Sequence, residues 1–166
     1  MIPEIKKILF PTDLSENAQL ALSYAMDLAE KYDAELTLLY VVPDIVEEMT
    51  ASTGFDFAEY FGKTQLDPFS KEGFIKAEEA IKAHILKACD KVKNSMAHCP
   101  LDLNHVIIQK GHPVQQIVET ATNENADIVV MGTQGQSGLI DILMGSVALG
   151  VVQKCPKPVL TVRLAD

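Results

Sequence analysis

Apolar residues follow two different periods along this chain of 166 residues. Short runs of branched apolar residues are typical of strands buried on both faces, and apolar residues recurring every three or four positions are typical of helices packed on a core. The third apolar run alternates with polar residues, as expected for an edge or near-edge strand. The predicted strands are residues 5–10, 34–42, 103–108, 128–131 and 157–162. The predicted helices begin after Asp13 or Ser15, at Lys71 (ending near His98), at Pro113 and at Val147 (ending at Lys154).

This alternation of strands and helices predicts a doubly wound α/β fold with helices on both faces of a parallel sheet. Strand–helix–strand connections are right-handed, so the strands that end near Asp13 and Val41 reach the same rim of the sheet. The length suits one domain, residues 1–166, with a substantial core. Residues 43–70 break the pattern with glycine, proline and several aromatic side chains, and we interpret them as an insertion at the rim. The insertion is a lid, a segment that packs against a partner, or a surface excursion packed on its own domain.

Residues 128–146, I-V-V-M-G-T-Q-G-Q-S-G-L-I-D-I-L-M-G-S, combine a buried strand, a glycine loop and a helix start. The strand stops at Gly132, and Ser146 is a good N-cap for a helix beginning at Val147. Free N–H groups and a helix dipole then converge on one point, which suits a phosphate. Glycine at these positions permits a positive φ and a close approach of phosphate oxygens.

The spacing of this loop resembles the G-x2-G-x9-G-S/T signature of the ATP-binding branch of the universal stress proteins. Gly132, Gly135 and Gly145-Ser146 carry the signature. Other features of the family occur in the same order: Pro11-Thr12-Asp13, Tyr40-Val41-Val42, Gly111-His112-Pro113, Ala126 to Gly132, and Pro156 to Leu160. The resemblance covers almost the whole chain and implies the strand order 3-2-1-4-5 of adenine nucleotide alpha hydrolase-like folds. Ligands of such sheets sit where the order reverses, between strands one and four.

The resemblance also implies roles for individual residues around an adenine nucleotide. The main chain at Pro11 and Thr12 lines the site, and Asp13 lies near the ribose or a phosphate-bound Mg²⁺ or Mn²⁺ ion. Val41 recognises adenine through its main chain. Met131 covers the base or the ribose. The residues that hold or flank the phosphates are Gly132, Gly135, Gly145, Ser146 and Val147.

Taken without the resemblance, the same residues have simpler explanations. Asp13 fits a helix cap, Val41 and Met131 fit the core, and the glycines fit a strand-to-helix corner. The loop also lacks a positive charge, because it carries Gln134, Gln136 and Asp141 and the first cation is Lys154. The preference among ATP, ADP and AMP therefore stays open.

Charge and cysteine usage exclude several classes of function. A formal net charge of −9 leaves no basic patch for nucleic acid. No apolar stretch is long enough to span a bilayer or to form a signal-peptide core, so we expect a cytoplasmic protein. Cys89, Cys99 and Cys155 are odd in number and lack C-x-x-C spacing, so we expect reduced structural thiols and neither a disulfide nor a zinc site.

The leading hypothesis is a non-enzymatic stress-response or signalling protein that binds ATP, ADP or AMP. The family resemblance implies a homodimer through the last strand, residues 157–162, whose exposed edge needs protection. The alternatives are a slow ATPase and a nucleotide-free interaction module of the same fold. The chain has neither a P-loop G-x-x-x-x-G-K-S/T sequence nor a G-x-G-x-x-G sequence after its first strand, which disfavours P-loop hydrolysis and dinucleotide chemistry.

Overall fold

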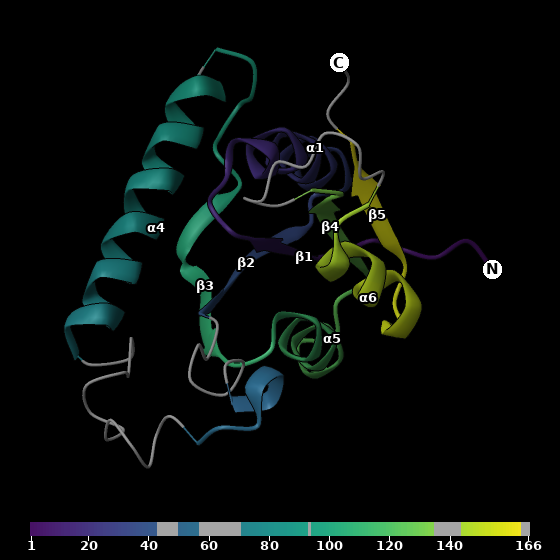
Figure 1. The fold of residues 1–166 in the computed structure, drawn as a ribbon. Coiled ribbons are helices and arrows are strands. Elements are labelled where there is room, and N and C mark those ends of the chain that lie inside the picture. The colour runs from purple at the N-terminus through teal and green to yellow at the C-terminus, as the bar shows by residue number, and fades with distance from the viewer. Residues whose placement is uncertain (43–49, 57–70, 93, 135–143, 164–166) are drawn as a thin grey trace.

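The computed structural model describes residues 1–42, 50–56, 71–92, 94–134 and 144–163. One parallel sheet has the strand order β3-β2-β1-β4-β5, which confirms the predicted doubly wound α/β fold and its order (Figure 1). The strands are β1 (Lys7–Thr12), β2 (Glu35–Val42), β3 (Leu101–Lys110), β4 (Ile128–Gly132) and β5 (Val159–Val162). The helices are α1 (Glu16–Tyr32), α4 (Lys71–Val92), α5 (Pro113–Asn123) and α6 (Ser146–Lys154).

Helices cover both faces of this sheet because successive strand residues point to opposite sides. Phe10 of β1 and its same-face neighbours pack against α1 and α4, whereas Leu9 and its same-face neighbours pack against α5 and α6. The two layers of helices lie on opposite sides of the strands in Figure 1. The sheet is therefore buried on both faces where β1 and β4 run, as their unbroken apolar runs predicted.

Helix α1 begins at one of the two predicted caps. The hydroxyl of Ser15 accepts a hydrogen bond from the N–H of Ala18 at 3.2 Å, so Ser15 is the N-cap and Asp13 is not. The helix ends at Tyr32, and its C-cap, Asp33, adopts the left-handed conformation with φ 51°. Its buried stripe consists of Ala18, Ala21, Leu22, Ala25, Met26 and Ala29.

Several element boundaries differ from those read from the sequence. Helix α4 ends at Val92 instead of near His98, because Asn94 and Ser95 favour turns and the chain reverses to enter β3. Strand β1 continues through Pro11 to Thr12, β3 is longer at both ends, and β5 begins at Val159. Pairing with a neighbouring strand decides these limits, and side-chain type does not reveal it.

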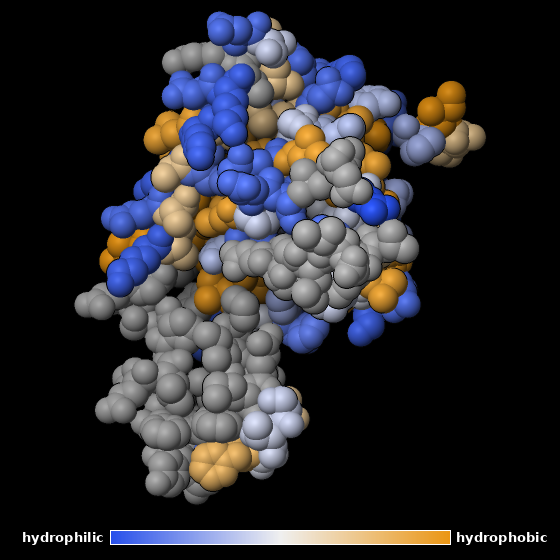
Figure 2. Space-filling view, turned by 45° about the horizontal axis from the view of Figure 1, so that its top comes forward, coloured by the Kyte–Doolittle hydropathy of each residue, from blue (hydrophilic) through white to orange (hydrophobic). Residues whose placement is uncertain are grey.

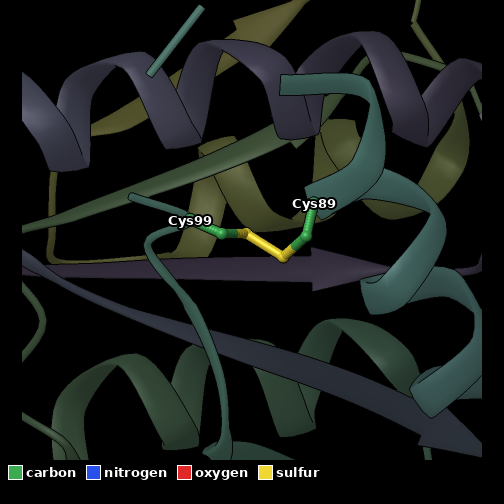
Figure 3. The surroundings of a disulfide bond; sticks show 2 residues. All are labelled: Cys89 and Cys99. Carbon is green, nitrogen blue, oxygen red and sulfur yellow. A yellow bond between two sulfur atoms is a disulfide. The ribbon is translucent and has the colours of Figure 1, made fainter. Parts of the chain in front are cut away.

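The prediction of three reduced cysteines is wrong. Cys89, near the end of α4, forms a disulfide with Cys99, which lies just before β3 (Figure 3). Their Cα atoms are 5.4 Å apart although they are separated by 10 positions, because the chain turns back between them. Cys155, after α6, is a free thiol. The C-x-x-C criterion missed the pair because the turn after α4 creates this proximity.

Two further predictions concern parts of the chain outside the sheet. Within the insertion, residues 50–56 are described and residues 50–53 are helical, whereas the predicted lid lies mostly outside the described residues. None of the described helices is long and apolar enough to cross a membrane.

Candidate functional site

The last residue of β1, Thr12, and the next residue, Asp13, lie at the carboxyl end of the sheet. The N–H of Leu14 donates to Oγ1 of Thr12, and the N–H of Ser15 donates to Oδ1 of Asp13, both at 3.0 Å. Leu14 adopts a positive φ of 63°, which turns the chain from the strand into α1. The carboxylate of Asp13 is thereby fixed beside the start of the helix.

A crevice opens between β1 and β4 because proline interrupts their pairing. The N–H of Asp127, just before β4, donates to the carbonyl of Lys7 at 2.8 Å. Alternate residues of a strand face the same neighbour, so Pro11 also faces β4, and proline has no N–H to donate. The paired register of the two strands accordingly ends at Leu9–Val129. The two strands part beyond this pair.

The main chain of Thr133, which follows β4, bonds to β5 and to the residue just before α6. Its N–H donates to the carbonyl of Val162 at 2.9 Å, and its carbonyl accepts the N–H of Gly145 at 2.6 Å. Its side chain is buried. The bond from Gly145 uses the N–H that the glycine signature assigned to a phosphate, so this residue offers space to a ligand but no donor.

The two described signature glycines do not adopt the conformation that we expected of them. Gly145 has φ −67°, and Gly132 is not among the described residues with positive φ. A Cβ built on Gly132 would lie 3.5 Å from the carbonyl oxygen of Gln134, which is ordinary van der Waals contact. Close approach of a ligand is thus the remaining reason for glycine here. Gly135, Gln136 and Asp141 lie outside the described residues.

Helix α6 starts one residue earlier than predicted. Gly145 is the N-cap, without a side-chain bond, and Ser146 is the first helical residue. The first bond of the helix runs from the N–H of Leu149 to the carbonyl of Gly145 at 2.9 Å. The N–H groups of Ser146, Val147 and Ala148 precede that bond, and no described group accepts a hydrogen bond from them. They are therefore the donors that this part of the chain leaves available.

These segments enclose a cavity of about 290 Å³. Every residue predicted for the site lines it except Gly135, which lies outside the described part of the chain. Sequence reasoning missed several lining residues that carry no polar motif and are recognisable only by their place in the fold. The predicted residues are Pro11, Thr12, Asp13, Val41, Met131, Gly132, Gly145, Ser146 and Val147, and the missed ones are Ala18, Leu39, Pro113, Ile117, Thr133, Gln134 and Ala148.

Val41 presents main-chain groups at the end of β2. The carbonyl of the next residue, Val42, accepts the N–H of Gly111 beside β3 at 3.1 Å. Successive residues of a strand direct these groups to opposite sides, so those of Val41 face β1. The last register pair, Thr12–Tyr40, directs the N–H of Val41 to the carbonyl of Thr12. The carbonyl of Val41 lies beyond that pair and is the acceptor available at the cavity.

The charge of the cavity wall is low. Among the described lining residues, Asp13 is the single charged side chain, and none is basic. Lys154, the first cation after the glycine loop, lines a different hollow with His112 and residues of α5. An anion bound here would consequently rely on main-chain donors, a helix N-terminus or an added cation.

Known proteins of one family resemble this chain in sequence and in fold. Residues 4–163 match the model of the universal stress protein family. The chain is 35% identical over 164 residues to Universal stress protein MJ0577 of Methanocaldococcus jannaschii, covering 95% of this chain and 94% of that protein. The solved structure of MJ0577 superimposes with a TM-score of 0.69 at 29% identity, covering 99% of each chain.

Two more distant structures share the fold. One is a universal stress protein in complex with cAMP, with a TM-score of 0.57, 21% identity, and coverage of 97% of this chain and 98% of that one. The other, from Archaeoglobus fulgidus, is in complex with dAMP, with a TM-score of 0.56, 20% identity, and coverage of 96% and 98%.

Proposed function

The chain belongs to the universal stress protein family, and we propose that it binds an adenine nucleotide, as ATP, ADP or AMP, in the cavity between β1 and β4. The observation that carries this proposal is the group of N–H donors on Ser146, Val147 and Ala148 at the wall of that cavity. Three adjacent donors at a helix N-terminus suit a phosphate group. We assign the protein a non-enzymatic role in stress response or signalling.

Apolar side chains supply a place for the base. Leu39, Val41, Met131 and Ile117 line the cavity. Its volume of about 290 Å³ is close to the lower end of the range of roughly 300–1,000 Å³ that is usual for small-molecule sites. The carbonyl of Val41 accepts a hydrogen bond from an exocyclic amine, which adenine has and hypoxanthine lacks. Specificity for adenine would then come from the main chain.

The phosphates would lie against the start of α6. The hydroxyl of Ser146 adds a side-chain donor to the three N–H groups, and Gly132 leaves the space that a Cβ would occupy. Asp13 is suited to a hard cation such as Mg²⁺ or Mn²⁺ held by the phosphates, because carboxylate oxygens are the ligands that these ions prefer. Such a cation would supply the positive charge that the described wall lacks.

The composition of the wall supports binding without turnover. Phosphoryl transfer needs charged groups that stabilise the transferred phosphoryl and a residue that positions the nucleophile. Of the described lining residues, only Asp13 carries a charge, and none is histidine, lysine or arginine. The complexes of two relatives with cAMP and dAMP, both adenine nucleotides, support the same ligand class for this chain.

We also propose that residues 157–162 pair two copies into a homodimer. Strand β5 is an edge of the sheet, and its residues Val159–Val162 are half-buried in the single chain. An open apolar edge favours pairing with another strand. Light scattering after size exclusion would measure the mass, and Thr161→Pro, which removes a strand N–H, should shift a dimer toward monomer.

Calorimetric titration with ATP, ADP, AMP and ITP, each with Mg²⁺, tests the nucleotide proposal. ATP should give saturable heat and bind about tenfold more tightly than ITP, the value of one hydrogen bond lost at a buried acceptor. Gly132→Ala should fold normally, since its Cβ meets only ordinary contacts, yet weaken ATP binding about tenfold or more. Ser146→Ala should weaken binding by a smaller factor.

Ser23→Ala is the matched control for Ser146→Ala, because Ser23 is an exposed serine on α1 that does not line the cavity. Absence of saturable heat with any adenine nucleotide up to about 1 mM, a weak affinity on the usual scale, would refute the proposal. Turnover of ATP that disappears in Asp13→Ala while binding survives would favour the slow-ATPase alternative.

A further inference from the structure

Few of the described side chains of helix α4 are buried. Among its residues 75–91, Ile81 and Ile85 are 1% and 4% exposed, and no other described side chain is fully buried. Hydrophilic and apolar side chains are mixed on the upper left of Figure 2. Of the large apolar side chains of α4, Ile75 and Leu86 are 51% and 67% exposed. Burial therefore holds the described stretch of this helix, residues 75–91, at few points.

The disulfide, the half-buried side chains of Met96 and Cys99 packed on the core, and two hydrogen bonds hold the end of α4 and the chain that leads to β3. The N–H of Ala97 donates to a carboxylate oxygen of Glu30 at 3.2 Å, and Lys91 Nζ donates to Oε1 of Gln19 at 2.9 Å. Both bonds are exposed to solvent, so each contributes little. The bond between Cys89 and Cys99 is the one covalent tie between described residues of α4 and of the chain entering β3.

Cys89 and Cys99 are half-buried, so part of each residue is in contact with solvent in the folded protein. The disulfide also lies far from the nucleotide cavity along the fold, because α4 ends and β3 begins at the amino end of the sheet. None of the residues that line the cavity belongs to α4 or to residues 94–100.

We propose that Cys89 and Cys99 form a reversible thiol–disulfide modification site that exchanges with small disulfides and thiols while the sheet stays folded. In the oxidised state the bond clamps the end of α4 to the chain entering β3. In the reduced state this flank opens locally. The nucleotide cavity keeps its structure in both states.

The exchange balances with a glutathione-type disulfide as the oxidant. A thiolate of the pair attacks one sulfur of the small disulfide, forms a mixed disulfide and releases one small thiolate. The second cysteine, as its thiolate, then attacks the protein sulfur of that mixed disulfide and releases the second small thiolate. Two electrons pass from the protein pair to the small disulfide, and the two protons of the protein thiols end on the released thiols or in solvent.

Cys155 provides an internal contrast. It is half-buried like the pair, but the disulfide leaves it as the free cysteine of the chain. Exchange at Cys155 stops at a mixed disulfide, because no second thiol of the same chain remains to resolve it. The Cys155→Ser protein therefore isolates the behaviour of the pair.

The experiment equilibrates full-length Cys155→Ser protein in buffers of stepwise glutathione ratio, quenches with acid, alkylates free thiols under denaturing conditions and measures intact mass. The number of labels should change from none to two in one step within this series, with circular dichroism showing folded protein throughout. Cys89→Ser and Cys99→Ser, each in this background, should instead accumulate a mixed disulfide with one glutathione.

Two results would overturn reversible exchange. In the first, the pair stays oxidised in the most reducing buffer until the protein unfolds, which would make it a permanent structural bond. In the second, both thiols stay reduced in excess glutathione disulfide, or carry only mixed disulfides.

Hydrogen exchange read by mass spectrometry tests the local consequence. Reduction should accelerate exchange in residues 86–100 about tenfold or more, which corresponds to about 1.4 kcal/mol of local opening, and leave β1 and β4 unchanged. Cys89→Ser should reproduce the reduced pattern without any reductant, and Cys155→Ser should keep the dependence on reductant. Uniform acceleration over the whole chain, or no change at residues 86–100, would contradict a local clamp.

Discussion

Helices α1 and α4 cover the same face of the sheet, but different forces hold them there. Helix α1 buries a continuous stripe through its 17 residues and begins at a hydrogen-bonded cap. The described side chains of α4 include only two buried anchors, Ile81 and Ile85, and a disulfide fastens its end. Packing thus fixes the wall of the cavity, whereas the flank formed by α4 depends on a covalent bond.

The proposed nucleotide site and the proposed thiol–disulfide site therefore depend on different parts of the molecule. The proposed nucleotide site uses main-chain groups at the carboxyl ends of strands and at the start of α6, which packing positions. The proposed thiol–disulfide site lies on the flank, where few contacts oppose local opening. A change of redox state should therefore alter the flank with little effect on the cavity.

Truncating one anchor in each helix should have the largest effect and test the comparison directly. Leu22→Ala, in the buried stripe of α1, should lower the free energy of unfolding by about 3–4 kcal/mol, because a large buried side chain leaves a cavity. Ile85→Ala in α4 should cost about 2 kcal/mol, since its surroundings can collapse more easily. Urea denaturation followed by circular dichroism measures both, and equal costs would show that α4 is packed as firmly as α1.

Removing the disulfide should come next in size. Cys89→Ser should lower the free energy of unfolding by about 2–3 kcal/mol, because the bond restricts the unfolded chain over a short loop. Cys155→Ser is the matched control and should change this free energy by less than about 1 kcal/mol. Denaturation in the absence of reductant gives the comparison, and an unchanged midpoint in Cys89→Ser would be inconsistent with a bridged pair in solution.

A substitution that crowds α6 against α5 should have an intermediate effect on the free energy of unfolding. A Cβ on Gly150 would lie 2.8 Å from Cγ2 of Val114, so Gly150→Ala forces the two helices apart. The overpacking cost of about 1–3 kcal/mol should exceed the helix-propensity gain of about 1 kcal/mol. ATP binding should also weaken, because α6 carries the proposed phosphate donors.

The double variant Gly150→Ala/Val114→Ala removes the clash and is the control for this prediction. It should be more stable than the sum of the two single changes predicts, by about 1 kcal/mol for residues in contact. Additive effects in a denaturation cycle would mean that the helices accommodate the methyl group without strain.

Lowering the pH should have the smallest effect on stability. The group concerned is a carboxylate at the amino ends of β1 and β4, the two strands that flank the cavity. The N–H of Lys6, and that of Lys7, donate to the Asp127 carboxylate at 2.8 and 2.9 Å and lower the pKa of Asp127. A folded pKa below the unfolded value of about 3.9 stabilises the fold above that pH, and this stability is lost as the pH falls through the folded pKa.

Asp127→Asn should remove this acid dependence and cost at most about 1 kcal/mol at neutral pH, because solvent screens the exposed carboxylate. Glu79→Gln, an exposed carboxylate change on α4, is the control. Unfolding free energies measured between pH 3 and pH 7 would contradict the assignment if Asp127→Asn kept the full slope of the parent protein.

Much of the fold followed from local pattern. The period of the apolar residues identifies buried strands such as Ile128–Met131 and amphipathic helices such as α1. Short crossovers between them then restrict the topology. The strand order came from the motif resemblance, because periodicity contains no information about which strands are neighbours. The residues expected at the rim, apart from the undescribed Gly135, line one cavity for the same reason: parallel strands carry their carboxyl ends to one edge.

The pattern of residues, together with the family motif, was enough to predict the elements, their sequential arrangement and the rim at which Asp13, Val41 and Gly132 meet. The contact between Cys89 and Cys99, and the bond from the N–H of Gly145 to Thr133, became evident only in the folded chain. Periodicity records which face of an element is buried, so it survives in the sequence. A disulfide across a turn or a bond across a loop depends on where distant backbone atoms come together, and that follows only once the helices and strands have packed.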